Sequence, residues 1–328
     1  MNVLVIGLGS MGRRRIRLIK RDYPEIRIAG VDREEARRKR AEEELQIRSY
    51  SDLEEALSEG SFDSVFVSTP PLTHAGIIRE CLMKDLHVFT ELNLVDDFYE
   101  ENMALAEEKE RVLFLSSTFL YRKEIQRIKQ ILDSSDAPVS YTYHTGQYLP
   151  DWHPWENYKS FFVSDSRTSG CREIMAIELP WIVELFGDVT GIHFIKRKNS
   201  SLEIDYDDSY YMILEHKGGN VGTMVVDVVS RKAVRNLEVF GETLYLTWDG
   251  RPEGLCIFDL QEKKEIQEPL YDNIDSRGDY SATIIENAYA DEIKSFFETI
   301  QGLTSPRYTF EKDKKIIQII NQIETGEE

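Results

Sequence analysis

The chain has 328 residues, a formal net charge of −19 and a hydrophobic fraction of 41%. A chain of this length is long for one hydrophobic core, so we expect two domains. The acidic balance argues against nucleic acid or an anionic membrane as a partner, because both carry charge of the same sign. No apolar run approaches the ~20 residues that a membrane span needs.

The three cysteines, Cys81, Cys171 and Cys256, lie far apart in the sequence. Their spacing matches neither a metal site nor a disulfide framework. The N-terminus lacks a basic segment followed by an apolar core and a cleavage site. We therefore expect a cytoplasmic protein that holds no structural metal.

The first part of the chain, residues 1–122, alternates short apolar runs with amphipathic segments. The apolar runs predict strands over Asn2–Ile6, Ile26–Val31, Ser64–Ser68, His87–Thr90 and Val112–Ser116. The segments between them predict helices over Met11–Arg21, Arg33–Glu44, Ser51–Ser58, His74–Lys84 and Asp97–Lys109. Strands and helices that alternate in this way form a doubly wound parallel sheet, the Rossmann fold. Such sheets bind ligands outside the carboxyl ends of their strands.

The pattern changes after Arg122–Asp133, which predicts a helix linking two domains. Further along, strands dominate, over Ser140–Tyr148, Thr190–Lys196, Asp208–His216, Val221–Val229, Ala233–Phe240 and Thr243–Trp248. Their alternating side chains are typical of a mostly antiparallel sheet. We expect an α/β protein: a dinucleotide-binding Rossmann domain over residues 1–122, then an α+β domain over residues 135–328. The helices that close the chain are expected to pack back on the first domain.

The N-terminal strand runs directly into a G-x-G-x-x-G stretch at residues 7–12, which then opens a helix. Gly7 allows the tight turn, Gly9 lets the backbone approach a pyrophosphate, and Gly12 lets the helix pack closely on the sheet. The helix begins at Ser10 and Met11, where free amides and the helix dipole attract phosphate. Because strand, glycines and helix occur in the required order, the stretch predicts a dinucleotide site.

Asp32 follows twenty residues after Gly12, where the second strand is expected to end. Its carboxylate can accept hydrogen bonds from the adenosine ribose hydroxyls, which favours NAD. The neighbouring Arg33 would tolerate a 2′-phosphate, so NADP stays open as the cofactor. The arginines of residues 13–15, in the first turn after the glycines, are further candidates to reach phosphate.

Two more stretches of candidate cofactor ligands end strands on the same edge of the predicted sheet. Ser68, Thr69 and Pro70 close one strand, and His74 begins the following helix. This places His74 beside the expected nicotinamide ribose, the alternative being an ordinary surface histidine of a helix. Glu91 directly follows the next strand and reaches the same edge.

Together these residues resemble the glucose–fructose oxidoreductase/inositol dehydrogenase family (Gfo/Idh/MocA). The resemblance rests on the glycine loop, Asp32, the T-P-P-x-x-H stretch of residues 69–74 and Glu91, and it covers nearly the whole chain. Members are typically NAD(P)-dependent enzymes that oxidise or reduce sugars, cyclitols and sugar derivatives. The resemblance implies NAD as the cofactor, a sugar-like small molecule as the substrate, and a homodimer or homotetramer formed through the second-domain sheet.

The chain departs from this family where the family keeps its chemistry. Members usually read E-K-P after the fifth strand, with the lysine in the active site, but Leu92 and Asn93 stand here instead. On a helix of the second domain, members commonly carry a histidine and a later aspartate. The matching segment here places Ile177 and Pro180 at those positions, and a register shifted by one would place Glu178 at the histidine position instead; neither register has a histidine. None of the usual proton-transfer groups is reproduced.

Oxidation of an alcohol by hydride transfer needs a group that takes the hydroxyl proton, and such a group is worth roughly 10²–10⁴-fold in rate. Four titratable residues are candidate catalytic groups. They are Glu173 and Glu178, which flank the lost histidine, and His153 and Lys159, in the loop that follows the first strand of the second domain. The alternative for the two glutamates is a structural pair with a neighbouring Arg or Lys.

Candidate substrate ligands lie in the same two segments. Arg172 would stabilise an alkoxide or bind an acidic sugar, while Tyr148, Trp152 and Tyr158 would stack against a sugar ring. The alternative for this aromatic loop is a structural lid or a contact between subunits.

Two functions follow from the sequence. The first is an NAD(P)-dependent oxidoreductase that acts on a sugar or sugar derivative with an atypical acid–base set. The second is a catalytically silent dinucleotide- or sugar-binding protein of the same fold that senses or scaffolds. An intact glycine loop is common to both, because function is decided by the site and not by the fold.

Overall fold

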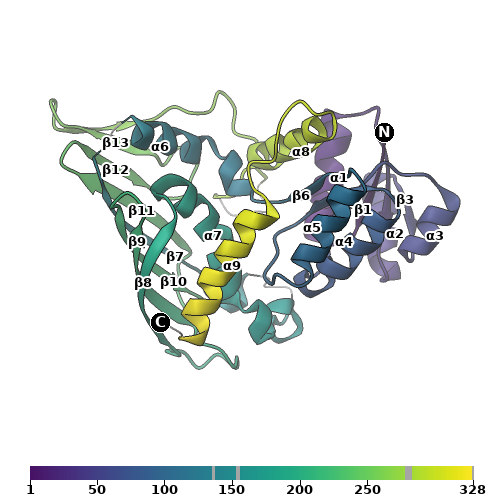
Figure 1. Cartoon of the computed structure of the whole chain (residues 1–328), viewed down its shortest axis with the longest axis horizontal. Coiled ribbons are helices and arrows are strands. Elements are labelled where there is room, and N and C mark those ends of the chain that lie inside the picture. The colour runs from purple at the N-terminus through teal and green to yellow at the C-terminus, as the bar shows by residue number, and fades with distance from the viewer. Residues whose placement is uncertain (135–136, 153–155, 278–282, 327–328) are drawn as a thin grey trace. The chain divides into compact units, whose positions relative to one another are not determined.

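The computed structural model describes residues 1–134, 137–152, 156–277 and 283–326 (Figure 1). The chain forms two compact units. Unit 1 comprises Met1–Thr118 and Tyr289–Lys315, and unit 2 comprises Phe119–Ala288 and Ile316–Glu328. Within the described ranges, no helix combines the length and the apolar character needed to cross a membrane.

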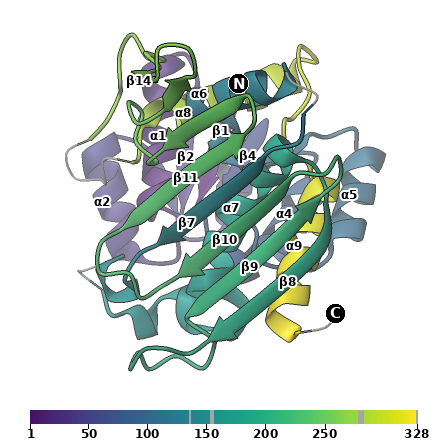
Figure 2. The same cartoon turned by 90° about the vertical axis from the view of Figure 1, so that its left-hand side faces the viewer.

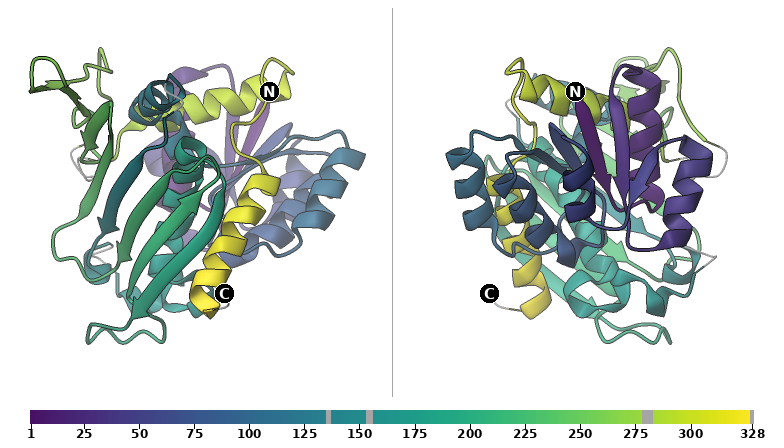
Figure 3. Two further views of the ribbon diagram at one scale, coloured as in Figure 1. Left: turned by 60° about the vertical axis from the view of Figure 1, so that its left-hand side comes forward. Right: turned by 90° about the vertical axis from the view of Figure 1, so that its right-hand side faces the viewer.

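Unit 1 is built on a six-stranded sheet of order β3-β2-β1-β4-β5-β6, in which every neighbouring pair is parallel. The strands are β1 (Asn2–Ile6), β2 (Arg27–Val31), β3 (Arg48–Tyr50), β4 (Ser64–Val67), β5 (His87–Thr90) and β6 (Leu113–Leu115). The strand order reverses between β1 and β4, so the predicted doubly wound Rossmann sheet is confirmed. The right-hand view of Figure 3 shows this sheet with helices along both faces.

The helices of unit 1 cover the sheet and leave the carboxyl ends of its strands for the loops. They are α1 (Ser10–Asp22), α2 (Glu35–Leu45), α3 (Leu53–Glu59), the 3₁₀ turn η1 (Pro71–Thr73), α4 (His74–Met83) and α5 (Tyr99–Glu108). A helix from the far end of the chain, α8 (Glu286–Ile300), closes one face. Its Phe296 meets Phe66 and Phe89 edge-on, with ring centroids 5.2 and 5.5 Å away. These buried aromatic contacts fix α8 on β4 and β5.

Unit 2 is built on an eight-stranded sheet of order β14-β13-β12-β11-β7-β10-β9-β8 (Figure 2). The strands are β7 (Ser140–Gly146), β8 (Val189–Arg197), β9 (Ser209–His216), β10 (Val221–Asp227), β11 (Val234–Gly241), β12 (Leu244–Trp248), β13 (Cys256–Asp259) and β14 (Lys264–Gln267). Only β7 and β10 pair in parallel within the described ranges, which confirms the expected mostly antiparallel sheet.

One face of this second sheet is covered by α7 (Gly170–Phe186), and the other is bare of helices in the described part of unit 2. Side chains alternate accordingly along β7: Tyr141 and Tyr143 are buried, while Thr142 is exposed. The remaining helical segments are η2 (Thr118–Tyr121), α6 (Lys123–Asp133), η3 (Leu149–Asp151), η4 (Tyr158–Ser160), η5 (Phe162–Ser164), η6 (Ser166–Thr168) and α9 (Phe310–Thr325).

Several elements differ from the sequence-based expectation. Strands β3, β13 and β14 were not predicted, because each has only three or four residues and a weak apolar pattern. The predicted linking helix forms as α6 and belongs to unit 2.

Candidate functional site

The glycine loop connects β1 to α1, and two of its three glycines are required by the backbone itself. Gly7 has a φ of +93°, and a Cβ there would lie 2.4 Å from the Ser68 carbonyl oxygen. A Cβ on Gly12 would lie 1.8 Å from the carbonyl oxygen of Gly7, so α1 packs against the turn without room for a side chain. At Gly9, by contrast, a Cβ would meet nothing within 4 Å. Gly9 therefore lines open space, where a pyrophosphate can approach the backbone.

The N-terminal end of α1 offers the backbone N–H donors and the positive dipole end that bind a phosphate group. No side chain caps the helix at Gly9. The amides of Ser10 and Met11 therefore have no capping side chain in front of them, and the positive end of the helix dipole faces the loop. This donor set fits the pyrophosphate of a dinucleotide.

Asp32 stands beside the loop at the end of β2 and is only 8% exposed. Its Oδ2 accepts the amide of Leu8 at 2.8 Å, and its Oδ1 accepts the amide of Glu34 at 2.9 Å. These bonds fix the carboxylate, and each oxygen keeps a second lone pair for a ribose hydroxyl. Arg33 is exposed next to it, and Arg37 places Nη1 3.9 Å from Asp32 Oδ2. Cations therefore accompany the acid, and the geometry is compatible with both NAD and NADP.

Of the three arginines after the loop, Arg14 and Arg15 are buried, while half-buried Arg13 donates to the carbonyl oxygen of Leu8 in the loop at 3.0 Å. Arg15 is completely buried and binds Glu91 through Nε at 2.7 Å and Glu292 through Nη2 at 2.8 Å. Arg14 is buried with its guanidinium 4.4 Å from the centre of the Tyr289 ring. A cation at the N-terminal end of a helix is unfavourable unless an anion neutralises it, and the two glutamates supply that charge.

Glu91 therefore has a fixed position at the carboxyl end of β5. Both of its oxygens accept from Arg15, at 2.7 and 2.9 Å, and Ser68 Oγ lies 3.4 Å from Oε1. The second acid, Glu292, is fully buried, and burial raises its pKa above the ordinary value. One guanidinium thus ties α1, β5 and α8 together, and Glu91 stands at the edge of the sheet where the cofactor is expected.

His74 lies at the start of α4 but is not a surface histidine, since only 2% of it is exposed. Its Nε2 donates to the carbonyl oxygen of Thr69 at 2.7 Å, and its Nδ1 lies 2.7 Å from the side-chain amide of Asn93. Burial lowers the pKa of His74, which favours the neutral ring. Because both ring nitrogens are occupied, His74 orients the loop of Thr69 and Pro70 rather than offering a nitrogen to the cofactor.

In unit 2, the first turn of α7 is held on two sides. Ser169 caps the helix, its Oγ accepting the amide of Arg172 at 3.1 Å. Tyr206 accepts the amide of Gly170 at 3.3 Å and donates to the carbonyl oxygen of Val163 at 2.8 Å. These contacts fix the position of every side chain on this turn.

Glu173 lies on that turn, three residues after Gly170 and therefore on the same face of the helix. Its Oε2 is buried and has no hydrogen-bond partner among the residues that the structure describes. Burial raises the pKa of Glu173 to about 7. A carboxyl group in this state exchanges a proton near neutral pH, which is what a general acid–base group requires.

Glu178, one and a half turns further along α7, is surrounded by hydrogen-bond donors. Its Oε2 accepts from the Tyr143 hydroxyl at 2.6 Å and from Trp181 Nε1 at 2.8 Å. Its Oε1 accepts from Arg235 at 2.6 and 3.0 Å. Glu178 is completely buried, and these four bonds favour a structural role in joining α7 to β7 and β11.

Three other predicted residues bind protein groups. Lys159 is exposed and forms an ion pair with Glu203, and the Tyr158 hydroxyl accepts the amide of Glu203 at 3.2 Å. Arg172 pairs with Glu324 and donates to Asn321 Oδ1 at 2.7 Å, so its guanidinium is tied to the last turns of α9. His153, the other catalytic candidate in the loop that holds Lys159, lies outside the described residues.

Tyr148 and Trp152 lie beside the first turn of α7. The amide of Tyr148 donates to Ser230 at 2.7 Å, and Arg231 stacks 4.1 Å from the centre of its ring. Trp152 Nε1 donates to Gln147 at 3.1 Å, and a Cβ on Gly170 would lie 3.5 Å from the indole. The structure therefore brings Trp152 to the end of α7 that carries Glu173, and Tyr148 belongs to the same loop.

Sequence reasoning missed Asn93, Tyr206 and Arg231. Only Asn93 gave a signal, because it replaces the proline of the E-K-P pattern. The other two belong to connections between strands, and their partners are distant in the sequence. No local pattern marks such pairs.

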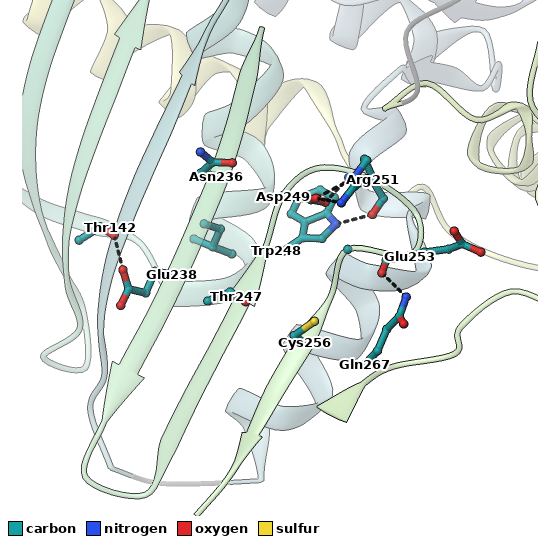
Figure 4. A pocket seen from close by; sticks show the side chains of 12 residues that line it. Thr142, Asn236, Glu238, Thr247, Trp248, Asp249, Arg251, Glu253, Cys256 and Gln267 are labelled. Carbon is teal, nitrogen blue, oxygen red and sulfur yellow. Dashed lines mark hydrogen bonds and ion pairs between the residues drawn. The ribbon is translucent and has the colours of Figure 1, made fainter. Parts of the chain in front are cut away.

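A cavity of about 560 Å³ lies on the face of the second sheet that α7 does not cover (Figure 4). Most of its lining residues are polar, among them Thr142, Glu238, Thr247 and Gln267, and Figure 4 shows these side chains spread over separate strands. None of the predicted catalytic, cofactor or substrate residues lines it. The size is that of a small-molecule pocket, but the cavity is separate from the groups described above.

Comparison with known proteins adds the following. Residues 1–117 match the family model GFO_IDH_MocA, described as an oxidoreductase family with an NAD-binding Rossmann fold. No curated protein matches the chain. Among solved structures, the UDP-N-acetylglucosamine 3-dehydrogenase of Acidithiobacillus ferrooxidans has a TM-score of 0.79 at 18% identity, over 99% of this chain and 97% of that one.

Two further solved structures are similar along nearly the whole chain. Levoglucosan dehydrogenase in complex with NADH has a TM-score of 0.80 at 15% identity, over 98% of this chain and 95% of that one. An oxidoreductase of Agrobacterium radiobacter, in complex with NAD⁺, L-tartaric acid and magnesium, has a TM-score of 0.80 at 15% identity, over 98% and 94%. Identities this low show a shared fold. Over residues 1–117, the chain is similar to the NAD-binding Rossmann fold that this oxidoreductase family model describes.

Proposed function

We propose that the protein is an NAD(P)-dependent oxidoreductase that oxidises or reduces a CH–OH group of a sugar or sugar derivative, with Glu173 as its proton-transfer residue. One observation carries the proposal: Glu173 has a buried oxygen without a hydrogen-bond partner in the described residues and a pKa raised to about 7. An unpaired buried carboxyl costs stability and is kept where function needs it.

The cofactor would be held by unit 1. The amides of Ser10 and Met11 face its pyrophosphate, Asp32 accepts from its ribose hydroxyls, and Ser68 and Glu91 line the edge toward the nicotinamide. When bound, the nicotinamide supplies hydride acceptance or donation. Asp32 favours NAD, while the nearby cations Arg33 and Arg37 would also tolerate the 2′-phosphate of NADP.

The substrate would be held by unit 2, beside Tyr148 and Trp152. In the oxidative direction, the hydroxyl O–H bond breaks and its proton passes to ionised Glu173, while the C–H bond breaks as a hydride. In the reductive direction, neutral Glu173 returns the proton to the forming alkoxide. Two neighbours in fold are a UDP-N-acetylglucosamine dehydrogenase and a levoglucosan dehydrogenase, which supports a sugar or nucleotide-linked sugar as the substrate class.

The second candidate, a catalytically silent binding protein, is favoured by Leu92 and Ile177, which replace the acid–base groups of the resembling family. A turnover screen separates the two. Purified protein is incubated with NAD⁺ or NADP⁺ and a panel of sugars, sugar acids, sugar phosphates and nucleotide sugars, and formation of reduced cofactor is followed by absorbance. Turnover of one substrate class supports the oxidoreductase. Tight NADH binding without turnover of any member supports the silent protein.

The role of Glu173 is tested on the substrate that the screen identifies. We expect Glu173→Gln to lower kcat by roughly 10²–10⁴-fold with little change in KM, because the amide cannot take a proton. The matched control is Glu184→Gln, which changes an exposed carboxylate on the same helix. Equal kcat in both variants would assign proton transfer to another group.

We further propose that two copies of the chain associate through the bare face of the second sheet. Ile195, Tyr211, Ile213 and Val221 stand on adjacent strands with 41–55% of their surface exposed. An apolar patch of this kind, opposite a helix-covered face, is suited to a second apolar sheet. Light scattering should give a multimer for the wild type and a smaller species for Ile213→Asp. An unchanged mass in that variant would move the contact elsewhere.

A further inference from the structure

Arg231 differs from the other arginines that stack on aromatic rings in the described part of the chain. Those of residues 15, 48, 122 and 235 each form an ion pair with a glutamate, and Arg14 contacts Met11. Arg231 lies 4.1 Å from the centre of the Tyr148 ring and has no ion pair or hydrogen bond to any described residue. In a chain of net charge −19, an exposed guanidinium that stacks on a ring and has no carboxylate partner is a candidate anion ligand.

Main-chain hydrogen bonds join the two segments that carry the stacked side chains. The amide of Tyr148 donates to Ser230 at 2.7 Å, and the amide of Leu149 donates to Val228 at 2.9 Å, so the loop after β7 runs alongside the β10–β11 connection. Asp227 holds that connection by accepting the amides of Val229 at 2.9 Å and Ser230 at 2.7 Å. Main-chain bonds therefore hold Tyr148 and the residues that directly precede Arg231.

A glycine makes room for this arrangement. A Cβ on Gly146, the last residue of β7, would lie 2.5 Å from the Asp227 carboxylate. Only glycine lets Asp227 fold over the end of β7 and hold the turn that carries Arg231. The glycine thus positions the connection that carries Arg231, while the exposed guanidinium itself is placed by its contact with the Tyr148 ring.

The stack also stands beside α7. A Cβ on Gly170, the first residue of this helix, would lie 3.0 Å from Val228 and 3.1 Å from Leu149. These two residues are the immediate neighbours of the segment that bears the stack. The segments that carry the stack therefore adjoin the N-terminal end of α7, where the helix dipole also favours negative charge, and that end carries Glu173.

We propose that Arg231, stacked on Tyr148, binds the phosphate or diphosphate group of a phosphorylated sugar substrate. The ring holds one face of the guanidinium and leaves its N–H edge free for a bidentate contact with phosphate oxygens. Arg172, the residue expected from sequence to bind an acidic substrate, is instead neutralised by Glu324. The inference rests on the proposed function for its substrate, but its own content, an anion subsite on unit 2, is measured by binding alone.

Binding is measured by calorimetry with glucose, glucose 1-phosphate and UDP-glucose, at saturating NADH so that the dinucleotide site of unit 1 is filled. The variants are Arg231→Gln and Arg231→Lys, and the matched control is Lys232→Gln, an exposed cation that does not stack on a ring. We expect Arg231→Gln to weaken binding of the phosphorylated ligands roughly 10- to 100-fold, Arg231→Lys to recover part of it, and Lys232→Gln to change it less than about twofold.

Each outcome decides the proposal. Weaker binding of both phosphorylated ligands supports a shared phosphate contact, and weaker binding of UDP-glucose alone supports a nucleotide-linked diphosphate as its source. Equal affinities in wild type and Arg231→Gln, or equal losses with Lys232→Gln, overturn it. If Arg231→Gln turns over a neutral sugar at the wild-type rate and binds phosphorylated ligands with wild-type affinity, the oxidoreductase proposal stands and the subsite proposal falls. Binding that depends on Arg231 but leads to no turnover supports the phosphate subsite and argues against the oxidoreductase.

Discussion

Two carboxylates five residues apart on α7 have opposite surroundings. Glu178 accepts four hydrogen bonds, from Tyr143, Trp181 and twice from Arg235, and is completely buried. Glu173 has a buried oxygen with no partner in the described residues, and burial raises its pKa to about 7. Both are glutamates of the same helix. What separates a structural glutamate from a chemically active one is the set of partners that the rest of the unit supplies.

The same contrast holds for the cations around this helix. Arg235 and Arg172 are each neutralised by a buried or half-buried glutamate, while Arg231 has only an aromatic ring beneath it. Paired groups hold unit 2 together, and unpaired ones are available to a ligand. The contrast predicts that removing a paired group lowers the stability of the fold, whereas removing an unpaired group lowers activity or ligand binding.

The largest effect is expected from breaking the paired region. Arg235→Met leaves the Glu178 carboxylate buried without its cation, which should lower the free energy of unfolding by about 3–5 kcal/mol. Urea denaturation measures the change. The double variant Arg235→Met/Glu178→Gln should recover part of the loss, because no charge is then buried alone. A loss below about 1 kcal/mol in the single variant would show that the pair does not hold α7 on the sheet.

The next largest effect on stability is expected at Glu173. Here removing the carboxylate raises the free energy of unfolding instead of lowering it. Its pKa is about 7 in the folded state against an ordinary value of 4.5, so the folded state keeps the proton longer. Stability is therefore complete below pH 4.5 and is lost as pH rises to about 7, by up to about 3 kcal/mol. Glu173→Gln has no such loss.

The measurement is the difference in the free energy of unfolding between wild type and Glu173→Gln at pH 4.5 and at pH 8. Comparing two pH values removes any effect of the amide that does not depend on pH. We expect the variant to gain stability over the wild type only at the higher pH. A difference that is equal at both values would mean that Glu173 ionises normally in the folded protein.

A smaller effect is expected at Asp32 in unit 1, where a paired carboxylate still has lone pairs for a ligand. Asp32→Asn keeps one carbonyl oxygen for the loop amides but replaces the other oxygen by a donor. Loss of one charge-assisted ribose contact should raise the Kd for NADH by about tenfold. Fluorescence titration of NADH gives the value, and circular dichroism checks the fold. Unchanged affinity would remove Asp32 from the ribose site.

The smallest effect is expected at Lys159, which the sequence suggested as a catalytic group. It is exposed and paired with Glu203, and exposed pairs contribute little, about 0–1 kcal/mol. Lys159→Ala should change kcat, KM and stability by less than about twofold. A rate loss comparable to that of Glu173→Gln would place the loop of residues 156–160 over the substrate.

The sequence was sufficient for the parts of the molecule that depend on local pattern. The alternation of strands and helices predicted the Rossmann sheet, and Gly7 and Gly12 are required for the steric reasons inferred from their spacing. Asp32 lies where the spacing placed it, beside the glycine loop. These features follow from steric rules that act over a few residues.

The sequence was not sufficient where a side chain finds a distant partner. Arg15 pairs with Glu292, 277 residues away, and Arg172 donates to Asn321, 149 residues away. No spacing rule links such residues, and for the same reason Glu173 and Glu178 were equivalent candidates until their surroundings were known. His74 was expected at the cofactor edge, but its burial and its contact with Asn93 depend on how two loops fold together.

The most direct test of the account is the pH dependence of kcat for wild type and Glu173→Gln in the oxidative direction. If Glu173 takes the substrate proton, wild-type kcat should rise with pH through an inflection near its pKa of about 7, because only the ionised carboxylate is a base. Glu173→Gln should lose both the inflection and most of the rate. A wild-type inflection that persists at the same pH in Glu173→Gln would contradict the account.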